Sequence, residues 1–306
     1  MQVLCEEANV ADVHTEAEIA SQPECWRRAA AADADLSAVL PRPGERVAVV
    51  GCGTSWFVAQ AYAALREASG QGETDAFAAS ETPLDRRYDR LLALTRSGTT
   101  TEVLDVLARV RGRIPTAAIT ADPDTPVMAA ADQIAVLDYA DERSVVQTRF
   151  ATTQLVLLRA SLGQDLAGTI ADAERAVTEP LPAGAEVAEQ FTFLGRGWTT
   201  GLAHEAALKM REAAGAWTES YPAMEYRHGP ISITGPGRVV WMFGTPPEGL
   251  ADQVAGVGGT MIVSDLDPLA DLIRVQRLAV EIARNRGLDP DTPRNLTRSV
   301  ILDAEV

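Results

Sequence analysis

A lysine and a glutamate three residues apart are the pair best suited to chemistry in this chain. Lys209 is the only lysine among 27 basic residues, and all the others are arginines. Arginine cannot replace lysine where an amine must release a proton or meet a carbonyl. Glu212 follows three residues later, so both side chains project from one face of a helix. A carboxylate buried beside an amine can serve as a general base near neutral pH.

The surroundings of this pair favour burial over an ordinary surface ion pair, which would contribute only a few tenths of a kcal/mol. The neighbouring positions are small or apolar: Ala206, Ala207, Leu208, Ala213 and Ala214. Farther along, His228 stands in Arg-His-Gly-Pro, a sequence that cannot lie inside a helix, so we expect it on a loop. Of the other histidines, we expect His14 in a terminal segment, and His204 is as compatible with packing as with chemistry.

Hydroxyl side chains gather in two glycine-containing turns. Gly51-Cys52-Gly53-Thr54-Ser55 follows one apolar run, and Arg96-Ser97-Gly98-Thr99-Thr100-Thr101 follows the next. Each turn opens a predicted helix, where free N–H groups and the helix dipole attract an anion and hydroxyls can donate to its oxygens. Single Ser or Thr residues at such places are usually helix caps. Two adjacent hydroxyl-rich turns instead predict a monophosphate site.

A dinucleotide site is disfavoured, because the run GCGTSW lacks the third glycine of G-x-G-x-x-G and no acidic residue follows at the expected place. Cys52 is interpreted as a small packing residue of the turn rather than a nucleophile, since no histidine lies near it in sequence. The spacing of Cys and His predicts no metal site, and we expect no cofactor.

The elements that must position these residues are short apolar strands alternating with helices, typical of parallel sheets. We expect strands at 47–50, 91–95, 116–120 and 133–137, and a helix over 15–40. Gly195-Arg196-Gly197 repeats the first G-x-G 144 residues later, and the segment from Val239 repeats the second unit. The chain is therefore predicted to be α/β, with two subdomains, each a doubly wound, flavodoxin-like parallel sheet flanked by helices. Their expected ranges are 41–178 and 186–306, after an N-terminal helical segment at 1–40.

The composition excludes several classes of protein. With 43 acidic and 27 basic residues the net charge is −16, which argues against nucleic acid as a partner. No run approaches the roughly 18 apolar residues of a membrane span, and the N-terminus lacks the pattern of a signal peptide. Three cysteines are too few for a disulfide framework. We therefore expect a cytoplasmic protein.

Taken together, the motifs resemble those of the sugar isomerase (SIS) family, specifically the isomerase half of glucosamine-6-phosphate synthases, over nearly the whole chain. The motifs that carry the resemblance are EIASQP, GCGTSW, TRSGTTTE, ERSVVQTRFATTQL, FLGRGW, HEAALKMRE, MEYRHGP and DTPRNLTRSV. The resemblance implies two SIS subdomains, a sugar phosphate held by the first two turns, and a homodimer in which a histidine reaches the neighbouring subunit's site.

Residue by residue, the resemblance assigns roles to the matching positions. Glu212 resembles the base that moves the proton between C1 and C2, Lys209 its amine partner, and His228 the ring-opening histidine. The positions that match the family's substrate-binding motifs are Cys52, Gly53, Thr54, Ser55, Thr95, Arg96, Ser97, Thr100, Val145 and Gln147.

Two departures from the synthases concern the reaction. The synthases begin with a glutaminase domain whose nucleophile is an N-terminal cysteine, whereas this chain begins with Met1 and Gln2, so we expect no glutaminase half. The synthase tail also carries a lysine that meets the sugar carbonyl, and the matching residue here is Arg298. A guanidinium stays protonated and cannot form a Schiff base, although it can hydrogen-bond a carbonyl or hydroxyl. Either Lys209 or Arg298 is therefore expected to stabilise the enediol oxygen.

These features predict an isomerase and deaminase that acts on an amino-sugar 6-phosphate by abstracting the C2 proton. If the nitrogen were acylated, the same carbanion would instead eliminate the 3-substituent, which makes a dehydratase or lyase acting on N-acetylglucosamine 6-phosphate the alternative. A third hypothesis is a sugar-phosphate sensor without catalysis. The retention of Lys209, Glu212 and His228 argues against it.

Overall fold

The N-terminal part of the structure is helical, but as two helices rather than one. The computed structural model describes residues 13–32, 36 and 38–302, so residues 1–12 of the predicted N-terminal segment lie outside the described part. Helix α1 (His14–Ala20) and helix α2 (Gln22–Ala30) meet at Ser21, whose hydroxyl donates to the Glu18 carbonyl. The expected single helix over 15–40 is wrong, because Pro23 lacks an N–H and starts a new helix, which ends at Ala30.

The first sheet has five parallel strands in the order β2-β1-β3-β4-β5, which is the flavodoxin-like order. The strands are β1 (Val47–Gly51), β2 (Thr74–Ala78), β3 (Arg90–Leu94), β4 (Thr116–Thr120) and β5 (Gln133–Val136). The four strands expected from the apolar runs are confirmed to within one residue. The edge strand β2 was not predicted, because it begins Thr-Asp and four of its five residues are only half-buried.

The second sheet repeats this plan with one strand fewer, in the order β7-β6-β8-β9, again all parallel. Its strands are β6 (Gln190–Gly195), β7 (Trp217–Pro222), β8 (Arg238–Met242) and β9 (Thr260–Val263). As in the first sheet, the edge strand β7 escaped the sequence patterns because it is polar and mostly half-exposed. The predicted α/β class with two parallel sheets is confirmed.

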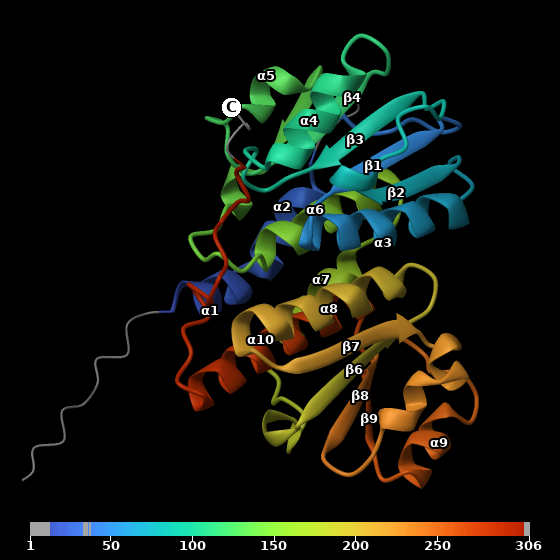
Figure 1. The fold of residues 1–306 in the computed structure, drawn as a ribbon, viewed down its shortest axis with the longest axis vertical. Coiled ribbons are helices and arrows are strands. Elements are labelled where there is room, and N and C mark those ends of the chain that lie inside the picture. The colour runs from blue at the N-terminus through green and yellow to red at the C-terminus, as the bar shows by residue number, and fades with distance from the viewer. Residues whose placement is uncertain (1–12, 33–35, 37, 303–306) are drawn as a thin grey trace, which may run out of the picture.

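Helices cover both faces of each sheet and form a double layer between the sheets (Figure 1). In Figure 1, α4 and α5 lie on the outer face of the first sheet and α9 on the outer face of the second, while α2, α3, α6, α7, α8 and α10 lie between the sheets. The α-helices after α2 are α3 (Thr54–Ala68), α4 (Thr101–Val110), α5 (Val127–Ala130), α6 (Arg149–Ser161), α7 (Ala167–Ala176), α8 (Thr199–Ala214), α9 (Leu250–Gly256) and α10 (Pro268–Asn285). Short 3-10 helices are η2 (Ala79–Glu81), η3 (Asp138–Ala140), η4 (Ala185–Val187), η5 (Glu225–His228) and η6 (Pro230–Ile233). No helix in the described part of the chain is both long and apolar enough to cross a membrane.

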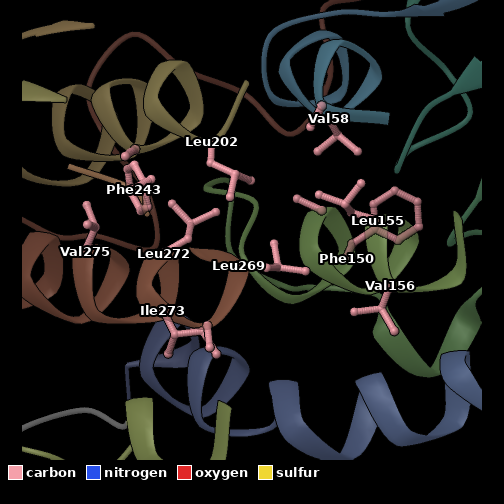
Figure 2. Close-up of a cluster of buried hydrophobic side chains, with 14 of the residues drawn as sticks. Val58, Phe150, Leu155, Val156, Leu202, Phe243, Leu269, Leu272, Ile273 and Val275 are labelled. Carbon is pink, nitrogen blue, oxygen red and sulfur yellow. The ribbon is translucent and has the colours of Figure 1, made fainter. Parts of the chain in front are cut away.

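The two halves share one hydrophobic core. Figure 2 shows Val58 of α3, Leu155 of α6, Leu202 of α8 and Leu272 of α10 gathered between the sheets, and all four are buried. At Gly201 of α8 the backbones themselves approach, because a Cβ there would lie 2.5 Å from the Phe57 carbonyl oxygen of α3. The helices that follow the two G-x-G turns are therefore packed against each other.

The repeated G-x-G has a physical cause that is the same in both halves. A Cβ on Gly51 would lie 2.7 Å from Ser55 and one on Gly195 would lie 2.2 Å from the Thr199 carbonyl oxygen, so a side chain would collide with the helix that follows. The second glycines, Gly53 and Gly197, have φ of +53° and +55°, which favours glycine. The pattern thus turns a strand sharply into a helix.

Candidate functional site

The first turn lies at the carboxyl end of β1 and begins α3. Thr54 and Ser55 are buried, and Gly53 is exposed. The Thr54 hydroxyl donates to Glu205 Oε1 at 3.2 Å, which connects this turn to helix α8 of the other half. Burial, together with the charge of Glu102, raises the pKa of the Cys52 thiol to about 11, so at neutral pH it stays protonated, as the reading of Cys52 as a non-nucleophile requires.

The second turn lies beside the first, because β1 and β3 are adjacent parallel strands. Its hydroxyls are linked to one another and to the C-terminal tail, the segment 286–302 that follows α10. Ser97 Oγ accepts from the Thr99 amide, and the Thr99 hydroxyl lies within hydrogen-bond distance of both Ser97 Oγ, at 3.1 Å, and Ser299 Oγ, at 2.9 Å. Thr100 Oγ1 also lies 3.3 Å from Ser299 Oγ, and the Thr101 amide donates to the Val300 carbonyl. The tail therefore lies against the turn predicted to hold phosphate.

Arg96, in the second turn, directs its side chain to backbone groups of other segments. The guanidinium is buried and donates to the backbone carbonyls of Ser144 and Val145 at 3.0 Å each, and to that of Arg298 at 3.2 Å. It also pairs with the buried carboxylate of Glu142 at 3.5 Å. Arg96 thus joins the second turn to the loop before α6 and to the tail.

That loop carries the predicted ligands Val145 and Gln147, both half-buried. Its shape is held by Glu142, which accepts from the Thr148 amide and hydroxyl and from the Arg149 amide. The Val145 amide donates to the Asp291 carbonyl, so the tail is held here as well. The Gln147 Oε1 atom is buried without a hydrogen-bond partner among the described residues.

Helix α8 carries Lys209 and Glu212, the residues predicted to act in acid–base chemistry. Lys209 Nζ hydrogen-bonds to Glu212 Oε2 and lies 3.5 Å from Glu205 Oε1. The side chains of Lys209 and Glu205 are each 1% exposed, whereas that of Glu212 is 19% exposed. The burial expected for the lysine is present, and Glu212 keeps access to solvent. Glu205 was missed in the sequence, although its i,i+4 spacing to Lys209 was a readable signal.

Burial and charge act in opposite directions on this cluster. Burial acts to lower the pKa of Lys209, but the charges of Glu205 and Glu212 and the hydrogen bond to Glu212 outweigh it and the pKa is raised. Burial raises the pKa of Glu205 to about 7, against the opposing charge of Lys209. Lys209 is therefore an ammonium paired with Glu212, while Glu205 holds a proton up to near-neutral pH.

Two predicted residues lie elsewhere. His228 is exposed at the end of η5, and no hydrogen bond or ion pair joins it to Lys209 or Glu212 in the described part of the chain. Arg298 lies near the second turn, but its guanidinium is bound to Asp141 and to the Glu142 carbonyl. Beside Glu212 a cleft of about 560 Å³ opens to solvent, lined by the end of α8 and by residues that follow α10.

His204 packs between elements and also makes a polar contact. Its Nδ1 lies 2.9 Å from Ser220 Oγ of β7, and its ring contacts that of Phe57 with centroids 5.5 Å apart. Burial, helped by the charge of Arg211, lowers its pKa. Among the described residues, no group of three His, Cys, Asp or Glu side chains is arranged to hold a metal ion.

Comparisons with known proteins agree with this architecture. No family model matches the chain. It is 28% identical over 330 aligned positions to a glutamine–fructose-6-phosphate aminotransferase (isomerizing) of Gloeobacter violaceus, covering 88% of this chain and 54% of that protein. The chain thus spans about half the length of the curated relatives it matches.

Solved structures show the same fold. A glucosamine-6-phosphate deaminase from Thermotoga maritima superposes with a TM-score of 0.79 at 24% identity, covering 94% of this chain and all of the other. The C-terminal domain of a glucosamine-fructose-6-phosphate aminotransferase from Francisella tularensis gives a TM-score of 0.75 at 22% identity, covering 93% of this chain and 99% of the other. The resemblance to enzymes of the sugar isomerase family that the motifs predicted is confirmed.

Proposed function

We propose that this protein isomerises and deaminates an amino-sugar 6-phosphate, releasing ammonia and a ketose 6-phosphate. The observation that carries the proposal is the contact between the two halves. The Thr54 hydroxyl of the first turn bonds Glu205, which lies against Lys209, which in turn bonds Glu212. A turn suited to an anion is thereby placed next to a buried amine–carboxylate pair suited to proton abstraction.

The phosphate is held by the two turns in this proposal. Thr54, Ser55, Thr95, Ser97 and Thr100 supply hydroxyls at or near the starts of α3 and α4, where free amide groups and the helix dipoles favour a dianion. The binding energy of the remote phosphate fixes the reacting carbons beside Glu212. The tail, held by Arg96 and Ser299, covers the second turn.

The chemistry then needs one base and one cation. Glu212 removes the C2 proton of the open-chain aldose, and Lys209 stabilises the oxygen charge of the resulting enolamine. Return of the proton to C1 leaves an imine at C2. Water adds to this imine and expels ammonia, which leaves a ketone at C2.

Ring opening is assigned to His228 of a second subunit. His228 is exposed and is not bonded to Glu212 or Lys209 of its own chain, while the cleft beside Glu212 gives access from outside. These features support a homodimer in which each subunit donates His228 to the other. We also place the protein in the cytoplasm, since Cys25 and Cys52 are free thiols.

A lyase acting on an N-acetylated substrate is the second candidate, and Arg298 favours it. The position that meets the sugar carbonyl in the synthases has no amine here, and its guanidinium is engaged with Asp141. A C2 carbanion with an acylated nitrogen cannot lose ammonia and eliminates the 3-substituent instead.

One experiment separates these functions. The protein is incubated with a panel of amino-sugar 6-phosphates, free and N-acetylated, and the products are analysed by mass spectrometry together with an ammonia assay. Ammonia and a ketose phosphate from a free amine are expected. An unsaturated product from the acetylated sugar would favour the lyase, and binding without turnover across the panel would leave a sensor.

A further inference from the structure

Glu205 is a buried acid that the proposed reaction does not use. It lies on α8 four residues before Lys209 and seven before Glu212, so the three side chains lie along one stripe of the helix. Its side chain is 1% exposed. Charged groups are seldom buried without a partner, so the contacts of this carboxyl show how its charge is managed.

Both of its contacts are made by one oxygen. Oε1 accepts from the Thr54 hydroxyl at 3.2 Å and lies 3.5 Å from Lys209 Nζ, whereas Oε2 is buried with no hydrogen-bond partner in the described part of the chain. Glu205 also borders a cavity of about 10 Å³ lined mainly by apolar side chains of α3, α6, α8 and α10. Such a space is at the lower limit for one water molecule, so it offers little solvation.

The charges around Glu205 come from its own helix. Lys209 favours its ionised form and Glu212 opposes it, while α3 contributes the neutral Thr54 hydroxyl. The other elements against it supply Leu155 of α6 and Leu269 of α10, which carry no charge. The charge of Glu142 influences Lys209, the partner of Glu205, by raising the pKa of the lysine. Ionisation of Glu205 is therefore favoured by a single ammonium and a single hydroxyl donor, and opposed by burial and by the charge of Glu212.

We propose that Glu205 is a positioning residue that couples binding of an anion at the first turn to uptake of a proton beside the Lys209–Glu212 pair. The inference rests on the proposed function, since it takes the first turn as the phosphate site. Thr54 has one hydroxyl proton. When that proton is donated to a bound phosphate, it is no longer donated to Glu205.

The loss of this donor and the arrival of a dianion both disfavour the ionised carboxylate. Glu205 then takes up a proton, which removes a negative charge that would otherwise compete with Glu212 for the ammonium of Lys209. Lys209 remains bonded to Glu212 while substrate is bound. Linkage is reciprocal, so ionised Glu205 must also weaken binding of the anion.

The test uses inorganic sulfate, which remains divalent throughout the neutral range and so carries no proton of its own. Its dissociation constant for the intact protein is measured by calorimetry from about pH 6 to about pH 8, in two buffers of different ionisation enthalpy. We expect the affinity to fall about tenfold over this range, the effect of a change of about one pKa unit on binding. Proton uptake should accompany binding near pH 7.

The variant Glu205→Gln keeps the shape of the side chain and removes the titration. Its affinity for sulfate should vary less than about twofold over the same range, because no group at this place changes charge. The matched control is His204→Gln, one residue earlier on α8 and also partly buried, which should retain the wild-type pH dependence. Thr54→Val tests the link from the other side and should at least halve the proton uptake.

The outcomes distinguish the inference from the function on which it rests. Sulfate binding by the wild-type protein without pH dependence or proton uptake overturns the coupling and leaves the proposed reaction standing. Equal pH dependence in Glu205→Gln also overturns it. No binding of sulfate at all removes the first turn as an anion site, and with it both proposals. If Glu205→Gln fails to fold, unchanged proton uptake in Thr54→Val is sufficient to reject the coupling.

Discussion

The two G-x-G turns of the molecule share a backbone but not a chemistry. In the first, Ser55 is buried and its hydroxyl bonds to no other described residue, while Thr54 reaches across to Glu205. In the second, the position equivalent to Ser55 is Thr199, whose hydroxyl accepts from the Arg196 amide and shares its one proton between the Arg196 and Phe243 carbonyls, each 3.1 Å away. The Gly195–Thr199 turn thus satisfies its own hydrogen bonds, whereas the Gly51–Ser55 turn leaves the Ser55 hydroxyl without a partner among the described residues.

The neighbouring turns differ in the same direction. The first half has Ser97 and three threonines before α4, whereas the second has Pro246 and Pro247 before α9, and proline has no N–H to offer an anion. In the second half the residues suited to chemistry, Lys209 and Glu212, lie instead within helix α8. In the proposed function, one repeat supplies the ligand-binding edge and the other supplies the helix that carries the acid–base residues.

The largest effect, on kcat, should come from a substitution of Glu212 on helix α8. Glu212→Gln keeps the hydrogen bond geometry but cannot accept the C2 proton, so we expect kcat to fall by roughly 10²–10⁴-fold, the usual contribution of a general base. Deuterium exchange at C2, followed by NMR with a sugar phosphate, should disappear while sugar-phosphate binding remains. Glu219→Gln, on β7 and outside the buried cluster, is the control. Undiminished exchange in Glu212→Gln would remove Glu212 from this role.

The next largest effect is on stability, and it concerns Glu205, whose hydrogen bond with Thr54 joins the two halves. The pKa of Glu205 is raised from 4.5 to about 7 by burial, so the folded protein binds a proton that the unfolded chain releases in this window. That contribution to stability is complete below about pH 4.5 and is lost as the pH rises to about 7. The stability of Glu205→Gln should not decrease in this way, because a glutamine side chain does not titrate.

The free energy of unfolding should therefore shift in favour of Glu205→Gln by about 3 kcal/mol across that window, relative to the wild type, at about 1.4 kcal/mol per pKa unit. Urea denaturation at a series of pH values measures it. A constant difference between the two proteins would show that Glu205 is ionised in the fold.

A matched pair of substitutions tests the comparison of the turns directly. Ser55→Ala should raise KM for the sugar phosphate about tenfold with little change in stability, because it removes a hydroxyl that the proposed function assigns to the phosphate. Thr199→Val should leave KM unchanged and cost about 1–2 kcal/mol of stability, since it removes the hydroxyl that bonds the buried Phe243 carbonyl and the Arg196 amide. If both variants changed KM alike, the two turns would not have diverged in function. Steady-state kinetics and thermal denaturation supply the two readouts.

The smallest effect is expected at the tail. Ser299→Ala removes the hydroxyl contacts with Thr99 and Thr100, a net loss of about 1 kcal/mol between the tail and the second turn. Amide hydrogen exchange should accelerate at Thr101, whose N–H donates to the Val300 carbonyl. Unchanged exchange would mean that the backbone contacts alone hold the tail.

The amino-acid sequence by itself determined the repeated plan of this protein. Buried strands of a parallel sheet are continuous apolar runs, and a strand that turns at once into a helix needs glycine where the backbones meet, so both features can be read locally. The side chains suited to chemistry, such as Lys209 and Glu212, were visible for the same reason: their types and spacing are properties of one helix. Edge strands β2 and β7 were not visible, because half-exposed strands carry polar residues that resemble loops.

Only the tertiary structure decided which of these residues meet. Glu205 accepts a hydrogen bond from Thr54, 151 positions away in the sequence. Arg96 donates to backbone carbonyls of two segments distant in sequence. The burial that raises the pKa of Glu205 arises from side chains of four helices packed between the sheets. Contacts and dielectric surroundings of this kind depend on how separate elements pack, and no local pattern of residues encodes them.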